Sequence, residues 1–434
     1  MKLTRIITLS LAAAMIACSL ASCKPKEKEK TPEVSEDGKT IIWEGEKALV
    51  KEAYSPKMND DGTVDRTAVW TGDPDFKPGK YWGNRPKSPF RDGEGEQFTY
   101  GLWCWSTDLF MPNCADNEAA MDMNMVLDQC VSNKVNEIYL SMLSKVQTAD
   151  NIDKVGYDGQ KYTEMELRGF IKKCSEYGIK VYALEGEGGE AALKWFAPGA
   201  PRTKRMVQTI AAINENAKSD DEKIAGLHLD LEAPLNASGI AETKKRYQDA
   251  ADFFTTTAKY CKDVGIKLQF DINAWTQETS MVTIDGKEIP YLDHLTKVLD
   301  NLTLMAYRNT AAQQWTQGTN ANGSSEVKFG AKNGCNILTG AELSLVYQMS
   351  KGERFITYDQ KGSKHYVDEM AKLRDTLLDY KKTSADPGAK DARLGAAIHH
   401  STSFWLLMSK AGDGPADFNK WQIDSKRWPW PPEK

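Results

Sequence analysis

A repeated alternation of short apolar segments with amphipathic segments runs through the chain from about residue 97. The spacing from one apolar segment to the next, roughly 35 to 60 residues, leaves room for a crossover helix and its loops. Eight segments have the composition of strands: Tyr100–Trp105, Glu137–Met142, Lys180–Gly186, Gly226–Glu232, Lys267–Asn273, Leu302–Tyr307, Cys335–Ala341 and Leu394–His399. Eight strand–helix units predict an α/β fold, the (β/α)8 TIM barrel, with a doubly wound open sheet as the alternative.

Two of the predicted helices end in nearly the same sequence. The first begins at Thr163 and Glu166, which have the spacing of a capping box. Its end, Cys174-Ser-Glu-Tyr-Gly-Ile-Lys-Val, matches a second end, Cys261-Lys-Asp-Val-Gly-Ile-Lys-Leu. In both, glycine stands where a left-handed residue closes a helix. The chain therefore uses one helix–glycine–strand joint twice, as repeated units require.

The first 22 residues have the pattern of an export signal. Two positive residues, Lys2 and Arg5, precede an apolar stretch of roughly ten residues, which is too short to span a bilayer. The segment Leu20-Ala-Ser-Cys23 then resembles the bacterial lipobox, in which the cysteine is acylated after cleavage. The resemblance implies that residues 1–22 are a lipoprotein signal peptide. It also implies that lipid such as palmitate on Cys23 anchors the protein in the cell envelope, facing outside the cytoplasm.

The remaining chain divides by composition. Residues 23–40 are charged and poor in apolar side chains, which predicts a flexible tether behind the lipid anchor. Residues 41–96 show little periodicity and are expected to form an irregular N-terminal extension packed on the barrel. The barrel domain is assigned to residues 97–412 and a C-terminal tail to residues 413–434.

Charge and cysteine usage exclude some functions. A net charge of −5 makes nucleic acid an unsuitable partner. The cysteines beyond Cys23 are scattered without metal-type spacing. Cys174 and Cys261 fall on the apolar stripes of predicted helices, where buried free thiols are expected.

The fourth strand carries three ionisable residues on one face. In Gly226-Leu-His-Leu-Asp-Leu-Glu232, alternation places the leucines against the helices. His228, Asp230 and Glu232 then point into the barrel, where apolar residues are usual. Burying three ionisable groups in one row costs free energy, so such groups are expected to be paired with partners or to have a function.

Other predicted strands add polar or aromatic residues at the same end. In a (β/α)8 barrel the reactive side chains gather at the carboxyl ends of the strands, so these residues predict one shared pocket. They are Gln269, Asp271, Asn273 and Trp275 on the fifth strand, Tyr307, Arg308 and Asn309 after the sixth, Glu342 on the seventh, and His399, His400 and Trp405 at the eighth. Aromatic rings suited to stacking on sugars are Trp103, Trp105, Trp275, Trp315 and Trp405.

This inventory favours glycoside hydrolysis, which uses two carboxyl groups and keeps one protonated as an acid. Glu232 is the predicted acid. Its partner is either Glu342 as a nucleophile, or Asp230 holding an amide of the substrate. The predicted catalytic residues are therefore Glu232, Asp230, Glu342 and Tyr307. The predicted carbohydrate-binding residues are His228, Asp271, Asn273, Trp275, Arg308, Asn309, His399, His400, Trp103, Trp105 and Trp405. No cofactor is expected.

The fourth and sixth strands resemble the family 18 glycoside hydrolases, whose motifs are Asp-Gly-x-Asp-x-Asp-x-Glu and Met-x-Tyr-Asp. Matching residues are Gly226, Asp230, Glu232, Met305 and Tyr307, whereas Ala225, His228 and Arg308 stand in place of aspartates. The pair Glu232 and Glu342 is similar to the large retaining clan, although Leu231 replaces its asparagine. Residues 97–405 also resemble uncharacterised bacterial barrel proteins with His-Leu-Asp-x-Glu, Met-Ala-Tyr-Arg and His-His segments.

Two other functions fit the same residues. A metal-dependent hydrolase would use His228, Asp230, Glu232, Asp271, His399 and His400 as ligands, although no compact metal motif occurs. A binding protein would hold a glycan or an envelope component at the same pocket without catalysis.

Overall fold

The structure, a computed structural model, describes residues 33–34, 41–42, 72–91, 98–105, 123–141, 146–147, 162–215, 217–273, 280–319, 325–344 and 354–408. The predicted signal peptide, Cys23, most of the tether and the tail lie outside the described residues, and so does Trp275. The chain divides into two compact units, residues 1–52 and 53–434. In the first unit, β1 (Glu33–Val34) pairs antiparallel with β2 (Ile41–Ile42).

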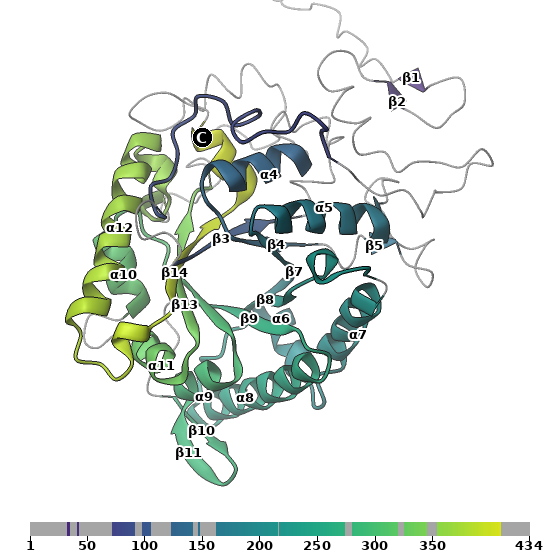
Figure 1. Cartoon of the computed structure of the whole chain (residues 1–434). Helices are drawn as coiled ribbons and strands as arrows, with labels where there is room; N and C mark the ends of the chain where they lie inside the picture. Colours follow the sequence, from purple (N-terminus) through teal and green to yellow (C-terminus); the bar gives the residue numbers. More distant parts are fainter. Residues whose placement is uncertain are drawn as a thin grey trace, which may run out of the picture. The chain divides into compact units, whose positions relative to one another are not determined.

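The second unit contains a closed barrel of eight parallel strands (Figure 1). The strands are β3 (Phe98–Cys104), β4 (Glu137–Leu140), β7 (Lys180–Gly188), β8 (Gly226–Glu232), β9 (Lys267–Asn273), β12 (Asn301–Met305), β13 (Asn336–Glu342) and β14 (Leu394–His399). They follow one another around the ring in sequence order, and β14 closes on β3. The predicted (β/α)8 barrel is confirmed, and three of its predicted strands, β8, β9 and β14, have the predicted bounds.

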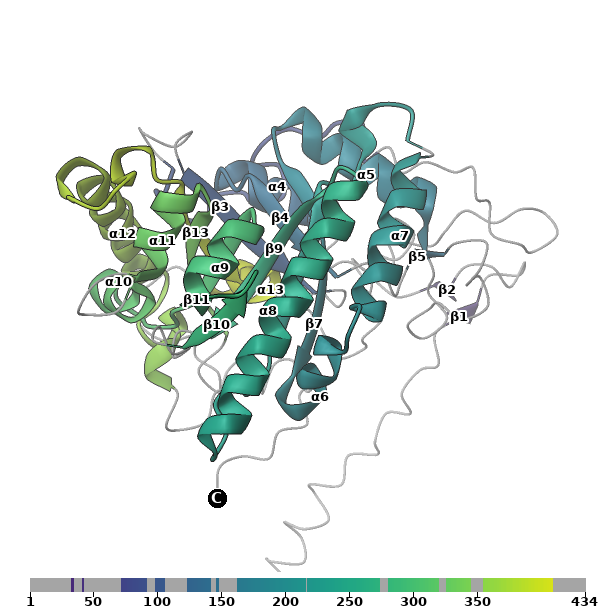
Figure 2. The same ribbon diagram turned by 90° about the horizontal axis from the view of Figure 1, so that it is seen from below.

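Helices surround this ring and cover its outer face (Figure 1). The long ones are α4 (Met123–Ser132), α5 (Glu164–Glu176), α7 (Pro201–Glu215), α8 (Ile240–Asp263), α9 (Tyr291–Val298), α10 (Ala311–Thr319), α11 (Ser325–Asn333), α12 (Ser363–Thr383) and α13 (Ser401–Met408), with a short α6 (Gly189–Leu193). Figure 2 shows α7 and α8 running along the outside of the strands.

Several shorter elements lie in the segments that connect the barrel strands and helices. They are β5 (Val146–Gln147) with β6 (Tyr162–Thr163), the hairpin β10 (Met281–Ile284) and β11 (Lys287–Pro290), and the 3-10 turns η2 (Lys194–Phe196), η3 (Asp220–Glu222), η5 (Arg354–Ile356), η6 (Tyr358–Gln360) and η7 (Ala389–Asp391).

The two repeated joints have the same local geometry. Gly178 and Gly265 have φ angles of 71° and 73°, a left-handed conformation in which a Cβ atom is unfavourable. After each glycine, the backbone N–H of the isoleucine donates to the carbonyl of the cysteine five residues earlier, at 3.0 Å in both joints. Cys174 and Cys261 are buried free thiols, as predicted.

Large side chains fill the barrel interior. Trp103, Tyr139, Tyr182, Leu184 and Leu338 are buried there in one cluster with Ala397. The leucines of β8 are also buried, at alternate positions to His228 and Asp230. On β8, the strand alternation therefore separates an outer row of leucines from an inner row of ionisable groups.

The described part of the N-terminal extension, residues 72–91, packs on α4 and α13. Asp128 on α4 accepts three backbone N–H bonds from it, from Gly79 (2.6 Å), Tyr81 (2.5 Å) and Trp82 (2.8 Å). The Trp82 ring also contacts that of Trp405, with centroids 5.4 Å apart. These contacts help to attach an otherwise irregular segment to the barrel.

None of the helices in the described part of the chain combines the length and the apolar character that a membrane crossing needs.

Candidate active site

The polar row of β8 runs from the barrel interior to its rim. His228 is fully buried, Asp230 is half-buried, and Glu232 is exposed where the strand ends. Parallel pairing with β9 sets His228 beside Gln269 and Asp230 beside Asp271. Because paired residues of neighbouring strands point to the same face, the two strands build a polar patch inside the barrel. The structure therefore brings together His228 and Asp230 of the fourth strand with Gln269 and Asp271 of the fifth.

His228 is bonded at both ring nitrogens. Its Nε2 lies 2.7 Å from Oδ2 of Asp271, and its Nδ1 lies 2.8 Å from Oε1 of Gln269. The amide nitrogen of Gln269 donates to Glu137 at 3.1 Å, which turns the amide oxygen toward the histidine. Both ring nitrogens therefore face oxygen atoms that can accept, an arrangement that favours the imidazolium form of His228. In agreement, the bonds to Asp271 and Gln269 and the Asp271 charge outweigh burial and raise the pKa of His228.

Two donors bond one oxygen of the Asp271 side chain. Its Oδ2 accepts from His228 and from the indole Nε1 of Trp103 at 2.8 Å. Its Oδ1 is buried and has no hydrogen-bond partner among the described residues, and the same holds for Oδ1 of Asp230. Burial and the neighbouring Asp271 charge raise the pKa of Asp230 to about 7.

A layer below the row was not predicted. The ring of Tyr139 stacks on His228 with centroids 3.8 Å apart, and the hydroxyls of Tyr139 and Tyr182 donate to Glu137. The signal was present, because Glu137 and Tyr139 alternate on the second strand as the polar residues of β8 do. These residues support His228 from beneath and connect it to β4.

His399 and Glu342 form a second pair across β13 and β14. The Nδ1 of His399 lies 2.9 Å from Oε2 of Glu342, whose Oε1 accepts the backbone N–H of Ser344 at 2.6 Å. Burial opposes protonation of His399, but the Glu342 charge and bond prevail and raise the pKa of His399 to about 9. The indole N–H of Trp105 points at Nε2 of His399 from 3.2 Å. That contact favours the neutral imidazole and acts against the rise.

Tyr307 joins this second pair. Its ring lies 5.9 Å from that of His399 in a stacked arrangement. Burial, together with the Glu342 and Asp230 charges, raises the pKa of Tyr307 well above its usual value. Trp103, Trp105 and Tyr307 therefore surround His399 with aromatic surface, on the same side of the barrel as Asp230.

Glu232 lines a hollow of about 460 Å³ at the rim. The hollow is bounded by Gly188, Gly189, Glu232, Ala233, Pro234, Leu235, Asn236, Tyr247 and Asn273. Partial burial, with the Asp271 and Glu342 charges, raises the pKa of Glu232, while His399 acts in the opposite direction. A carboxyl group with a raised pKa at the edge of an open hollow is suited to donating a proton.

Three predicted binding residues make packing contacts. The amide of Asn309 donates to Gln360 at 2.7 Å. The Trp405 ring lies under the guanidinium of Arg85, at 4.1 Å. The guanidinium of Arg308 lies 5.3 Å from the ring centre of Phe355.

His400 also bonds locally, since its Nε2 lies 3.0 Å from the hydroxyl of Ser403. Trp315 contacts Tyr380 of α12, with ring centroids 5.8 Å apart. Binding by Arg308, Asn309, His400 and Trp405 stays a prediction, as does binding by Trp275.

A metal site has little support from this geometry. Within the ranges that the structure describes, no group of three or more His, Cys, Asp and Glu residues is arranged to hold a metal ion. His228 has both nitrogens committed to acceptors, so it offers no lone pair to a cation.

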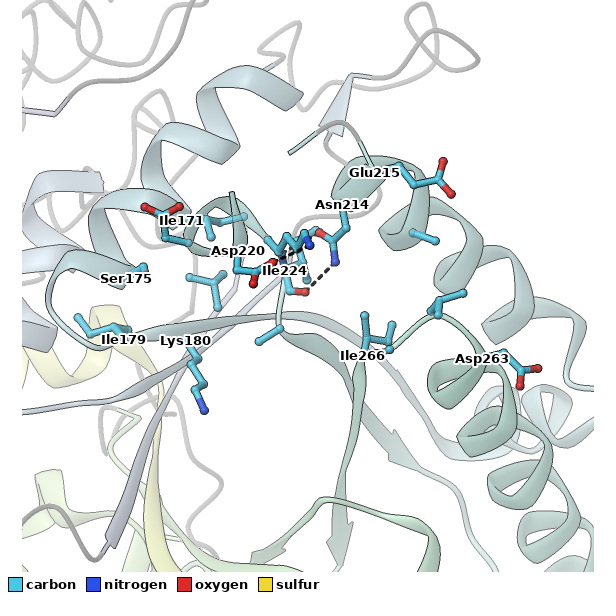
Figure 3. Close-up of a pocket in the computed structure, with 17 residues that line it drawn as sticks. Ile171, Ser175, Ile179, Lys180, Asn214, Glu215, Asp220, Ile224, Asp263 and Ile266 are labelled. Carbon is cyan, nitrogen blue, oxygen red and sulfur yellow. Dashed lines mark hydrogen bonds and ion pairs between the residues drawn. The ribbon is translucent and has the colours of Figure 1, made fainter. Parts of the chain in front are cut away.

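A larger hollow, about 720 Å³, lies where the strands begin (Figure 3). It is lined by residues at the starts of β7, β8 and β9, including Lys180, Ile224 and Ile266. Asn214 bonds both the N–H and the carbonyl of Ile224 at its edge. Residues at this end of a barrel serve stability, so the candidate site is the opposite end.

Comparison with known proteins finds similar solved structures only. No family model and no curated protein matches the chain. A family 18 chitinase from Pseudoalteromonas aurantia is similar at 10% identity and a TM-score of 0.37, covering 72% of this chain and 97% of its own. A chitinase from Chromobacterium violaceum is similar at 12% identity and a TM-score of 0.38, covering 72% and 98%.

The C-terminal domain of a chitinase-like protein from Desulfitobacterium hafniense is similar at 11% identity and a TM-score of 0.34. This chain spans 66% of that structure's length and the match covers 57% of this chain. Likeness at these values carries no argument about activity, so the function is argued from the site.

Proposed function

We propose that this chain is a glycoside hydrolase in which Glu232 is the general acid and Asp230 holds an amide of the sugar. The observation that carries the proposal is the inward row of β8. It sets a half-buried carboxyl, Asp230, one inward step below a rim carboxyl, Glu232, that lines an open hollow. Both carboxyls have raised pKa values, so both are suited to carry a proton when a substrate binds.

In the proposed reaction, Glu232 gives its proton to the glycosidic oxygen as the bond to the anomeric carbon breaks. The positive charge that develops at that carbon is met by the amide oxygen of the same sugar, which Asp230 holds in place. Water then attacks the anomeric carbon and returns a proton to Glu232. Substrates with an N-acetyl group next to the scissile bond are therefore proposed.

Glu342 as a nucleophile is the alternative pairing. Both of its oxygens already accept hydrogen bonds, from His399 and Ser344, and its side chain is only 5% exposed. Asp230 in contrast keeps one oxygen without a partner among the described residues. The contacts therefore support Asp230 as the partner of Glu232, and Glu342 as the residue that orients His399.

The aromatic residues near His399 support a carbohydrate ligand. Flat rings stack on sugar faces, and indole or phenol groups add one polar end. Trp105 and Tyr307 are half-buried at the strand ends, so each keeps some surface for a ligand. Asn273 lines the rim hollow beside Glu232 and adds one amide there.

The test is turnover of a panel of fluorogenic glycosides, with and without a 2-acetamido group, by the wild type and by Glu232→Gln. The variant is expected to lose at least about 100-fold in kcat, the usual contribution of a general acid. The matched control is Glu176→Gln, which removes an exposed carboxylate at the end of α5. Unchanged turnover by Glu232→Gln would remove Glu232 as the acid. Binding of oligosaccharides without turnover by the wild type would instead favour a non-catalytic glycan-binding protein.

We also propose that the enzyme is anchored in the cell envelope through lipid on Cys23. The lipobox-like segment before Cys23 and the charged residues after it support this proposal. Expression with an alkyne fatty acid should label the wild type and leave Cys23→Ala unlabelled. Equal labelling of the two would contradict the anchor.

A further inference from the structure

The carboxyl groups of Asp230 and Asp271 are neighbours inside the barrel. The two residues pair in register on β8 and β9, so their side chains leave adjacent strands on the same face. Each has one buried oxygen, Oδ1, without a hydrogen-bond partner among the described residues. Two carboxylates side by side repel each other, and a single proton between them removes the repulsion.

Asp271 is the member of the pair whose oxygen accepts hydrogen bonds from two donors. The imidazolium of His228 and the indole N–H of Trp103 both donate to its Oδ2. Charge-assisted bonds of this kind are the stronger ones, and both stabilise the carboxylate rather than the acid. The proton of the pair therefore resides mainly on Asp230.

The groups that face Asp230 come from the surrounding strands. Glu232 and His228 lie on its own strand, Asp271 on β9 and His399 on β14. Tyr307 lies just after the end of β12, and β7 presents Gly186 at this level. Of these, the negative Asp271 is in the paired position. Its charge favours a proton on Asp230, whereas the two histidines disfavour one.

We propose that Asp271 is a positioning residue for Asp230: its fixed negative charge, set by His228 and Trp103, keeps a proton on the carboxyl that meets the substrate. A protonated Asp230 can donate a hydrogen bond, which an ionised one cannot. In this chain a cation and a carboxylate from two strands therefore set the protonation of a third group.

The mechanism is electrostatic and does not relay protons. Gln269 lies between Glu137 and His228, and an amide cannot pass a proton on as a carboxylate or imidazole does. The buried hydrogen-bonded chain from Glu137 to Asp271 therefore lies beneath Asp230 without forming a proton relay.

The test titrates the carboxyl groups of purified protein labelled with ¹³C at aspartate Cγ, so it needs no substrate. Asp230 is assigned by the signal that disappears in Asp230→Asn. In the wild type this signal should titrate near neutral pH, well above the usual aspartate value of about 4. Asp271→Asn should lower the midpoint by at least about one unit, because the repelling charge is gone. His228→Gln removes a positive charge, so it should raise the pH midpoint at which the pair of carboxyls loses its last proton, by a similar amount.

The expected shifts of the midpoint in Asp271→Asn and His228→Gln have opposite signs. General damage to the fold would instead move the midpoint of both variants toward the usual aspartate value. The matched control is Asp293→Asn, which removes a buried carboxylate that bonds Lys297 and Lys332 outside the barrel, and it should leave the signal in place. A wild-type midpoint near 4, or shifts of the same sign in both site variants, would overturn the proposal.

A second readout rests on the proposed function. If turnover requires the Asp230 proton, the alkaline limb of kcat/KM should move down in pH in Asp271→Asn and up in His228→Gln. If the titration midpoints shift as expected but no protein shows turnover, the positioning role of Asp271 is kept. Only the proposed glycosidase activity is then contradicted. Turnover whose alkaline limb is the same in all three proteins would overturn the role of Asp271 in the reaction.

Discussion

His228 and Asp271 form an ion pair that solvent does not reach, with 2.7 Å between Nε2 and Oδ2 and both side chains 0% exposed. A buried pair gains little net stability over apolar residues of the same size, because both charges lose their hydration. Removing one partner is far more costly, because the other charge is then left unpaired. The pair should therefore respond to mutation as one unit.

We predict that His228→Leu lowers the free energy of unfolding by about 3 to 5 kcal/mol, the usual cost of leaving one buried charge unpaired. The double variant His228→Leu/Asp271→Leu should recover much of that loss, because no charge then remains in the dry interior. Urea unfolding of the single and double variants measures both values. Losses that simply add in the double variant would show that the two residues are not coupled.

The free energy of unfolding is expected to depend on pH through His399. Its folded pKa of about 9 lies above the usual value of 6.5, so the stability that it contributes is complete below about pH 6.5. That contribution is lost as the pH rises through 9. Glu342 has a lowered pKa and acts in the other direction, with stability that is lost only as the medium becomes acidic.

The measurement is the free energy of unfolding of the wild type and His399→Gln between pH 6 and pH 10. The difference between them should shrink toward pH 10, by at most about 3 kcal/mol, which corresponds to the shift from 6.5 to 9. Parallel curves would mean that His399 does not change its pKa on folding.

Trp105 tunes the same histidine. Its indole N–H points at Nε2 of His399, a bond that exists only while that nitrogen is unprotonated. Trp105→Phe removes the donor and should raise the pKa of His399 by about half a unit to one unit, since a neutral hydrogen bond contributes about 1 kcal/mol. NMR titration of the His399 ring proton measures the shift, and Trp315→Phe, outside the site, is the control. A fall in the Trp105→Phe variant would contradict this account.

The barrel was predictable because its strands and helices leave a regular hydrophobic periodicity in the sequence. Eight apolar segments at crossover spacing leave few topologies, and the ends of Gly226–Glu232 follow from turn residues on both sides. The inward row of His228, Asp230 and Glu232 followed from period two alone. Local pattern therefore determined which face each side chain occupies.

Partners across the barrel were not predictable in the same way. Which acceptor meets His228 depends on the register between β8 and β9, and a shift of two residues would set it beside Lys267 or Asp271 instead of Gln269. The packing roles of Asn309 and Trp405 depend on η6 and on the extension, which lie far away in sequence. Such contacts are set by tertiary structure, and a single sequence contains no direct signal for them.

Gly101 on β3 provides the space for the ring that supports His228. A Cβ atom at this position would collide with the hydroxyl and ring of Tyr139. Gly101→Ala should therefore push Tyr139 off the histidine and destabilise the fold by about 1 to 3 kcal/mol, as overpacked cores do. Near-ultraviolet circular dichroism and urea unfolding report the two effects.

The hydrogen bonds that attach residues 72–91 to α4 predict losses of stability of different size for two variants. Asp128 accepts three backbone N–H groups of residues 79–82, whereas Asn124 accepts one, from Asp73 at 2.9 Å. Trp82 is fully buried, so its N–H has no access to water once Asp128 is removed, and an unsatisfied buried donor costs about 1 to 3 kcal/mol. Asp128→Ala should therefore destabilise the protein by more than Asn124→Ala and should expose residues 72–91 to limited proteolysis first. Equal losses in the two variants, with no new cleavage in this segment, would mean that the aromatic contact between Trp82 and Trp405 holds the extension without the carboxylate.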